Sequence, residues 1–226
     1  SLNEYFSKFL PILDLIVNKP ILSEKEFQKV KKSTIDLIKK DKENPFNICF
    51  EKWKKIVYSS HPYAFNTFGN LNDVSKITYQ DVLDEFKNFE IRQKYLISNN
   101  SEINGEALGL STQKTLIGKA KTIVCELDPL NRIDFSINNS DQTIIMIGNQ
   151  TCSRRSSEYL PLKVLESYLS YGMSAFLFKL FREKNGITYD LGVFYPVRNE
   201  NAPFLVYLSV SNKNALLAFE LLSSLW

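Results

Sequence analysis

Hydrophobic residues recur every three or four positions through much of the first half of the chain, which is the spacing of amphipathic helices. Ser23 followed by Glu26, and Thr78 followed by Asp81, have the spacing of a helix-capping pair. A proline after His61 interrupts the pattern, since the residue before proline avoids helical backbone. The expected helices are residues 4–17, 23–40, 44–58 and the stretch that follows residue 78.

Shorter runs of hydrophobic residues in the second half of the chain indicate strands as well as helices. The expected strands are residues 95–97, 143–147, 188–193 and 204–210, and the expected helices are 159–169 and 214–226. A turn-rich loop containing Pro196 joins the last two strands, which predicts that they pair antiparallel. The sequence therefore predicts an α+β fold, with helices packed on a mainly antiparallel sheet.

Residues 171–189 combine a turn, a helix and the start of a strand. Gly172 stands where a left-handed or tight backbone is expected. An apolar helix face follows, and Asn185-Gly186 ends that helix with a residue that tolerates positive φ. The apolar face consists of Phe176, Leu177, Leu180 and Phe181.

This stretch reads as a glycine turn, a Ser-x-x-Leu-Phe helix and Arg-Glu-Lys-x-Gly-Ile-x-Tyr. It resembles the insulinase or pitrilysin family of zinc metallopeptidases, which includes the mitochondrial processing peptidases. In that family the motif lies in the half without zinc, and its Arg and Tyr reach the active site of the other half. The resemblance implies that Arg182 and Tyr189 are catalytic, and that Gly172 lets the backbone approach a peptide substrate.

The chemistry implied for this pair suits peptide hydrolysis. A Tyr189 hydroxyl could stabilise the tetrahedral oxyanion, and Arg182 could orient the substrate carbonyl or the tyrosine itself. Without the resemblance, Arg182 is a surface cation favoured at a helix C-terminus, and Tyr189 is a half-buried strand residue.

The first part of the chain resembles the later part of the catalytic half in the same family. The matching motifs are Asn18-Lys19-Pro20, Ser23-Glu24-Lys25-Glu26-Phe27, Asn44-Pro45, His61-Pro62-Tyr63-Ala64, Gly69 and Ile77-Thr78-Tyr79-Gln80-Asp81-Val82. Ala64 stands where the family has glycine. The resemblance implies a processing-peptidase-like two-layer half-domain. Residues 1–98 would be the end of a first subdomain, 99–140 a linker or mobile loop, and 141–226 the start of a second.

The zinc-binding motif of this family is absent from the sequence. It requires His-x-x-Glu-His on one helix, and the chain has one histidine, His61. The family's further Glu ligand matches Leu37, so either this half never bound metal or the neighbouring Asp36 is a degraded ligand. We expect no metal ligands in this chain and expect zinc in a catalytic half or partner. His61 is expected to cap or pack at a helix end.

Composition narrows the remaining classes of function. The net charge of +3 comes without a dense basic stripe, which argues against nucleic-acid binding. No apolar run approaches the roughly 20 residues of a membrane span. The cysteines, Cys49, Cys125 and Cys152, form no disulfide framework or metal pattern, so a cytoplasmic location is favoured without being required.

The resemblance gives two hypotheses for function. In the first, the chain is the non-catalytic portion of a zinc-dependent metalloendopeptidase, a fragment or subunit that is inactive alone. It closes the proteolytic chamber, with the catalytic half and an extended peptide as partners. In the alternative, it is a structural or partner-binding relative without peptidase activity. Because the chain begins at Ser1 rather than Met, we expect it to be part of a longer protein.

Overall fold

The computed structural model describes residues 5–59, 61–90, 133–135 and 140–225. Contacts divide the chain into two compact units. Unit 1 comprises Ser1–Asp36 and Asn70–Thr122, and unit 2 comprises Leu37–Gly69 and Ile123–Trp226. Within the described residues, no helix is long and apolar enough to cross a membrane.

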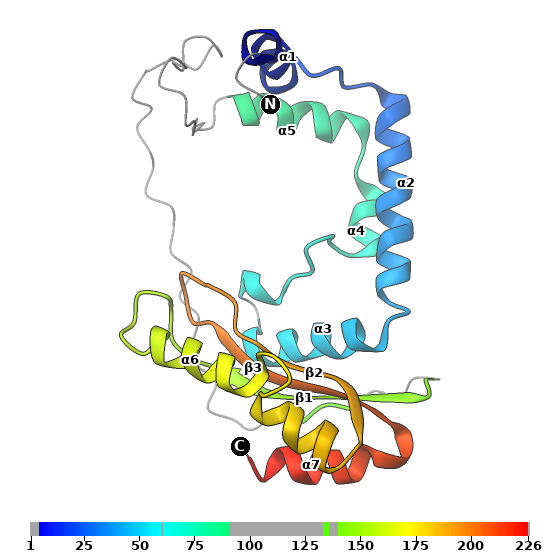
Figure 1. Cartoon of the computed structure of the whole chain (residues 1–226). Helices are drawn as coiled ribbons and strands as arrows, with labels where there is room; N and C mark the ends of the chain where they lie inside the picture. Colours follow the sequence, from blue (N-terminus) through cyan, green and yellow to red (C-terminus); the bar gives the residue numbers. More distant parts are fainter. Residues whose placement is uncertain (1–4, 60, 91–132, 136–139, 226) are drawn as a thin grey trace. The chain divides into compact units, whose positions relative to one another are not determined.

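Unit 1 is helical in its described part (Figure 1). Its elements are α1 (Phe6–Asn18), most of α2 (Glu24–Asp41), α4 (Leu71–Lys76) and α5 (Tyr79–Glu90). The predicted caps are present: the Glu26 amide donates to the Ser23 hydroxyl, and the Thr78 amide donates to the Asp81 carboxylate. Hydrogen bonds from the Thr78 amide and then the Thr78 hydroxyl lower the pKa of Asp81. The short helix α4 was not predicted.

Lys31 joins two parts of unit 1 that are distant in sequence. Its ammonium group lies 2.7 Å from the carbonyl oxygens of both Ser75 and Ile77, at the end of α4. The Tyr79 hydroxyl also donates to the Leu22 carbonyl at 2.7 Å. The side chains of α2 and α5 therefore satisfy carbonyls that the ends of the helices and loops leave open.

Unit 2 contains the sheet and the helices that cover it. In chain order its elements are α3 (Pro45–Tyr58), η2 (Pro62–Ala64), β1 (Gln142–Gln150), α6 (Tyr159–Ser170), η4 (Phe178–Lys184), β2 (Thr188–Phe194), β3 (Pro203–Ser211), η5 (Asn212–Asn214) and α7 (Ala215–Ser223). The strands form a three-stranded sheet in the order β1-β3-β2, and both pairings are antiparallel. The predicted fold class and the predicted antiparallel pairing of β2 with β3 are therefore confirmed.

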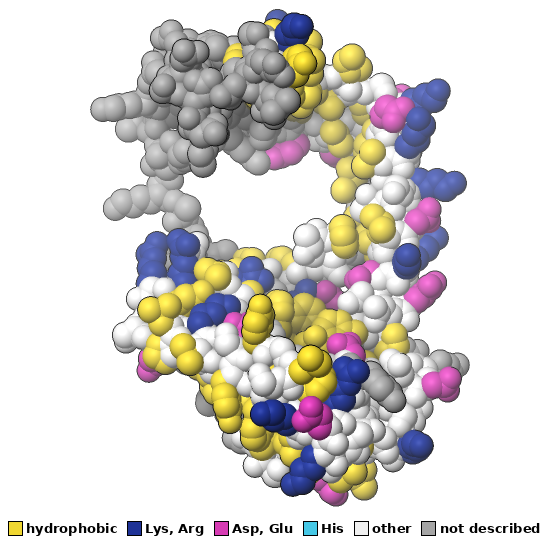
Figure 2. All heavy atoms as spheres, viewed as in Figure 1, with side chains coloured by type: hydrophobic (Ala, Val, Ile, Leu, Met, Phe, Trp, Pro, Cys, Tyr) yellow, Lys and Arg dark blue, Asp and Glu magenta, His cyan; other side chains and the backbone are white. Residues whose placement is uncertain are grey.

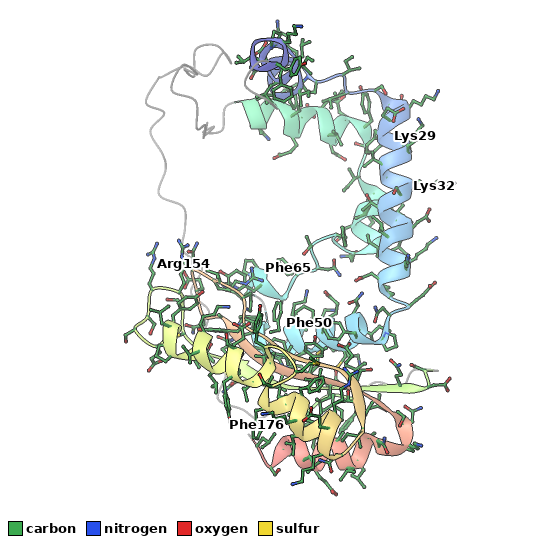
Figure 3. The ribbon with its side chains drawn as sticks, viewed as in Figure 1. Lys29, Lys32, Phe50, Phe65, Arg154 and Phe176 are labelled. Carbon is green, nitrogen blue, oxygen red and sulfur yellow. The ribbon has the colours of Figure 1, made fainter. Side chains whose placement is uncertain are left out.

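Both faces of the central strand β3 are covered, because its side chains alternate between two apolar layers. On one face, Val206 and Leu208 pack with residues of η4 and α7. On the other face, Leu205 packs with Trp53 and Tyr58 of α3. In Figure 3 the labelled Phe50 lies between α3 and the sheet, and its ring meets Phe194 edge-on at a centroid distance of 5.1 Å.

Hydrogen bonds fix α3 to the sheet as well. The Tyr58 hydroxyl donates to the Asn201 carbonyl at 3.0 Å, and the Gln150 amide donates to the Val57 carbonyl at 2.5 Å. Residues 37–69 thus pack with the sheet of unit 2, so the units do not coincide with the ranges 1–98 and 141–226. The assignment of residues 1–98 and 141–226 to two peptidase-like subdomains stays a prediction. The predicted strand 95–97, and the linker 99–140 apart from residues 133–135 and 140, lie outside the described residues.

Gly148 in β1 allows a close approach between two strands. A Cβ at this position would lie 2.3 Å from the Phe204 carbonyl oxygen and 2.7 Å from the Leu205 Cα, both of which are backbone atoms. We expect Gly148→Ala to lower the free energy of unfolding by about 1–3 kcal/mol, although alanine normally suits a strand better than glycine. Urea unfolding measures the change.

The exposed neighbour Asn149 provides the control, because Asn149→Ala should stay within about 0.5 kcal/mol of the wild type. A Gly148→Ala chain as stable as the Asn149→Ala chain would show that the strands separate at little cost.

Candidate active-site segment

The turn at Gly172 follows the end of α6 and has the backbone that the sequence predicts. Gly172 has φ +79°, and a Cβ there would meet no atom within 4 Å. Its carbonyl accepts the Ala175 amide at 3.2 Å, which starts the next helical turn. Tyr171 and Met173 on either side are exposed. The turn therefore presents open backbone between two apolar side chains.

The helix after this turn has its predicted apolar face, and its main part, η4, is a π-helix. Leu177 and Phe181 are buried in the core, while Phe176 and Leu180 are half-buried against it. Figure 3 labels Phe176, whose ring stacks on Tyr168 of α6. A π-helix is rare, and it is often found at functional sites.

Arg182 lies on the exposed side of η4, next to the fully buried Phe181. Its guanidinium carbon lies 5.0 Å from the centroid of the Phe178 ring, within the range of a cation–π contact. The core thus anchors the helix on one side, and the aromatic ring supports the arginine on the other.

The helix ends at Asn185-Gly186, as predicted. Gly186 has φ +59°, its amide donates to the Arg182 carbonyl at 3.2 Å, and the Ile187 amide donates to the Phe181 carbonyl at 3.0 Å. The side-chain amide of Asn185 donates to the Leu180 carbonyl at 2.7 Å. These bonds satisfy carbonyls that the last turn of the helix would otherwise leave unpaired.

Tyr189 occupies a break in the register of β2. Thr188 pairs with Val210 and Asp190 pairs with Ser209, so two steps along β2 match one step along β3. This is the geometry of a β-bulge, with Tyr189 as the extra residue. The side chain of Tyr189 lies outside the described residues, so its contact with Arg182 stays a prediction.

Thr188 holds the bulge on both sides. Its hydroxyl lies 2.9 Å from the Asp190 carbonyl oxygen and 2.5 Å from the Ser209 carbonyl oxygen on β3. The residue is 2% exposed. The sequence predicted Asn185 only as part of the turn that ends the helix and did not single out Thr188, because an asparagine at a helix end and a threonine in a strand are both ordinary.

A second tyrosine, Tyr207, lies on β3 opposite Gly192 of β2, on the sheet face that meets α3. Gly192 leaves room for the Tyr207 ring, since a Cβ there would lie 2.9 Å from the Tyr207 hydroxyl oxygen. Burial, followed by the nearby Asp190 carboxylate, raises the pKa of Tyr207. The raised pKa makes this hydroxyl harder to deprotonate than an exposed tyrosine.

The residues considered for metal binding do not form a site. Leu37 and Asp36 are exposed on α2. His61 is buried, and its Nδ1 accepts the Tyr63 amide at 3.1 Å, which confirms the predicted capping role. In the part of the chain that the structure describes, no group of three or more His, Cys, Asp or Glu residues could hold a metal ion.

One family model matches most of this chain. The family model described as the peptidase M16 inactive domain matches residues 75–226. Two curated relatives, each described as an uncharacterized zinc protease, come from Rickettsia felis and Rickettsia bellii, and each is 23% identical to this chain. The matches cover 97% of this chain but 54% and 55% of the relatives, so the chain spans about half their length.

Solved structures share the fold. A peptidase M16 inactive domain from Pseudomonas fluorescens has a TM-score of 0.73 at 20% identity, covering 98% of this chain and 55% of its own. A protease from Helicobacter pylori has a TM-score of 0.74 at 12% identity, with coverages of 99% and 57%. A chain of the complex III2 structure from Candida albicans has a TM-score of 0.55 at 15% identity, with coverages of 93% and 52%.

Proposed function

This chain belongs to the peptidase M16 family through its inactive domain, and on that premise we propose that it is the non-catalytic portion of a zinc-dependent metalloendopeptidase. Its proposed role is to close the proteolytic chamber against a catalytic half and to supply Arg182 and Tyr189 to peptide-bond hydrolysis. The observation that carries this proposal is the segment from Gly172 to Tyr189, in which a glycine turn, a π-helix and a strand bulge follow one another.

The proposed mechanism assigns one role to each of three residues. The Tyr189 hydroxyl donates a hydrogen bond to the oxygen that becomes negative when the peptide carbonyl is attacked. Arg182 orients the substrate carbonyl or the tyrosine through its planar, always charged guanidinium. Gly172, with open space around its Cα, lets a peptide backbone approach the turn.

The residues that the structure describes do not fit a zinc site. The sequence has one histidine, and its ring is buried as a cap on the Tyr63 amide. We therefore place zinc in the catalytic half. The relatives are about twice as long as this chain, so a catalytic half could lie in the same chain. Every role assigned above belongs to side chains or backbone of this chain and not to the metal.

An apolar surface on unit 2 supports pairing with a catalytic half. Leu160, Val164 and Tyr168 stand one turn apart along α6 and are each exposed by 60% or more. Figure 2 shows hydrophobic side chains gathered over this part of unit 2. A contiguous exposed apolar surface typically marks an interface between proteins.

The fold alone does not separate this role from the alternative, a structural or partner-binding relative without peptidase activity. The fold is shared with the peptidase M16 inactive domain from Pseudomonas fluorescens, with the Helicobacter pylori protease and with a chain of the complex III2 structure. Only a measured contribution of Arg182 and Tyr189 to cleavage distinguishes the two hypotheses.

Reconstitution with the catalytic half of the same protein tests the proposal. We expect the chain alone to bind no zinc at stoichiometric level by elemental analysis and to cleave no quenched peptide, and we expect cleavage when both halves are present. Arg182→Ala should lower the reconstituted rate by about 10- to 100-fold, because a misplaced reacting group is costly.

Lys179→Ala is the matched control, since Lys179 is an exposed cation on the same helix. Equal rates for the two variants, or zinc bound by the chain alone, would contradict the proposed function.

A further inference from the structure

We propose that Thr188 and Asn185 are positioning residues that fix the backbone on either side of the Arg182 and Tyr189 pair. This inference rests on the proposed function, because positioning matters only if that pair acts on a substrate. Neither residue would touch the peptide; each would act through the backbone that it holds.

Thr188 occupies a position where an apolar residue would be the simpler choice. Among the described residues, the buried polar side chains are those of His61 and Thr188. Thr188 pairs with Val210, a core residue, and belongs to the sheet face that packs against η4 and α7. A valine has nearly the same shape and would bury no hydroxyl there. We therefore attribute the threonine to a local backbone geometry that its hydroxyl holds, and not to the stability of the core.

That geometry is the bulge. The Thr188 hydroxyl lies within hydrogen-bond distance of a carbonyl just beyond the bulge and of a carbonyl on the partner strand. A strand shifted by one residue sends its side chains to the opposite face of the sheet. Holding the extra residue at Tyr189 therefore fixes the backbone register at that position.

Asn185 has the corresponding role at the end of η4. Its side-chain amide donates to the Leu180 carbonyl, one turn back and two residues before Arg182. The amides of Gly186 and Ile187 bind the Arg182 and Phe181 carbonyls in the same turn. Two irregular elements thus meet at Asn185–Thr188, and a side-chain hydrogen bond secures each of them. Regular helix and strand geometry would need neither bond.

Hydrogen exchange provides a test that does not depend on activity. In Thr188→Val we expect the amides of Tyr189 and Asp190 to exchange about tenfold faster, while the urea midpoint stays the same or rises. Thr143→Val is the control. Thr143 lies on β1, and its hydroxyl donates to the Asn212 side chain, so removing it should leave the exchange of the Tyr189 and Asp190 amides unchanged. Unchanged exchange in Thr188→Val would overturn the inference.

Kinetics on the reconstituted enzyme complete the test. We expect Thr188→Val and Asn185→Ala each to lower kcat by about tenfold with little change in KM, and Thr188→Ser to restore the rate. In a Tyr189→Phe background, Thr188→Val should have almost no further effect, because both changes remove the same contribution. Full additivity of the two changes would overturn the inference.

Faster exchange combined with a wild-type rate for Tyr189→Phe would contradict the proposed function and leave the backbone role of Thr188 in place.

Discussion

Tyr189→Phe is expected to lower kcat of the reconstituted enzyme on the order of 100-fold. The substitution removes one hydroxyl and keeps the ring, so the packing of the chain is nearly conserved. Loss of one donor to the oxyanion typically costs roughly 3 kcal/mol in the transition state. Few single changes of one atom in a folded chain produce an effect of this size.

The effect of Tyr189→Phe should fall on kcat more than on KM, because the oxyanion exists only in the transition state. The measurement is steady-state cleavage of a quenched peptide, with both halves present and equal concentrations of folded chain. Tyr207→Phe is a matched control, because Tyr207 lies on the neighbouring strand and packs against Phe46 of α3. A wild-type kcat for Tyr189→Phe would leave this tyrosine as a packing residue and favour the structural-partner hypothesis.

Phe181→Ala is expected to lower the free energy of unfolding by about 3–5 kcal/mol. Phe181 is 0% exposed in the core beneath β2 and β3, and its carbonyl accepts the Ile187 amide that ends η4. Truncating a fully buried aromatic ring loses its transfer free energy and leaves a cavity that the surroundings fill only partly. Such a loss is a large fraction of the stability of a typical domain.

Urea unfolding measures the loss for Phe181→Ala, with Phe65→Ala as the control. Phe65 is 68% exposed, so its truncation should cost less than about 1 kcal/mol. Similar costs for the two variants would mean that Phe181 does not anchor η4. Because Phe181 adjoins Arg182, the kinetics of this variant are informative only at equal folded concentration.

Helix ends and the pairing of neighbouring strands could be predicted from the sequence, because residues close together in the chain determine them. Asn44 before Pro45 caps α3, and Asn185-Gly186 ends the helix with positive φ. The alternation of residues 188–193 and 204–210, with a proline-containing loop between them, was sufficient to predict their antiparallel pairing.

The irregular features of the site were not predictable in the same way. The apolar spacing of Leu177 and Phe181 suits an α-helix and a π-helix alike, since both bury one face. The bulge at Tyr189 depends on the register with β3, and no neighbour in sequence reports that register. Likewise, the rings of Phe50 and Trp53 predict an apolar helix face but not that this face covers a sheet. Tertiary contacts decide these features, and periodicity reports only which side is buried.

The packing of α3 on the sheet also has a consequence during synthesis of the protein. Tyr58 binds the carbonyl of a residue 143 positions later in the chain, so α3 leaves the ribosome long before β3 exists. At 5–20 residues per second the wait lasts roughly 7–30 s. Through that interval the aromatic face of α3 has no complete sheet to cover and stays exposed to solvent. Slowing translation between α3 and β3 should therefore lower the yield of folded protein more than slowing it after β3.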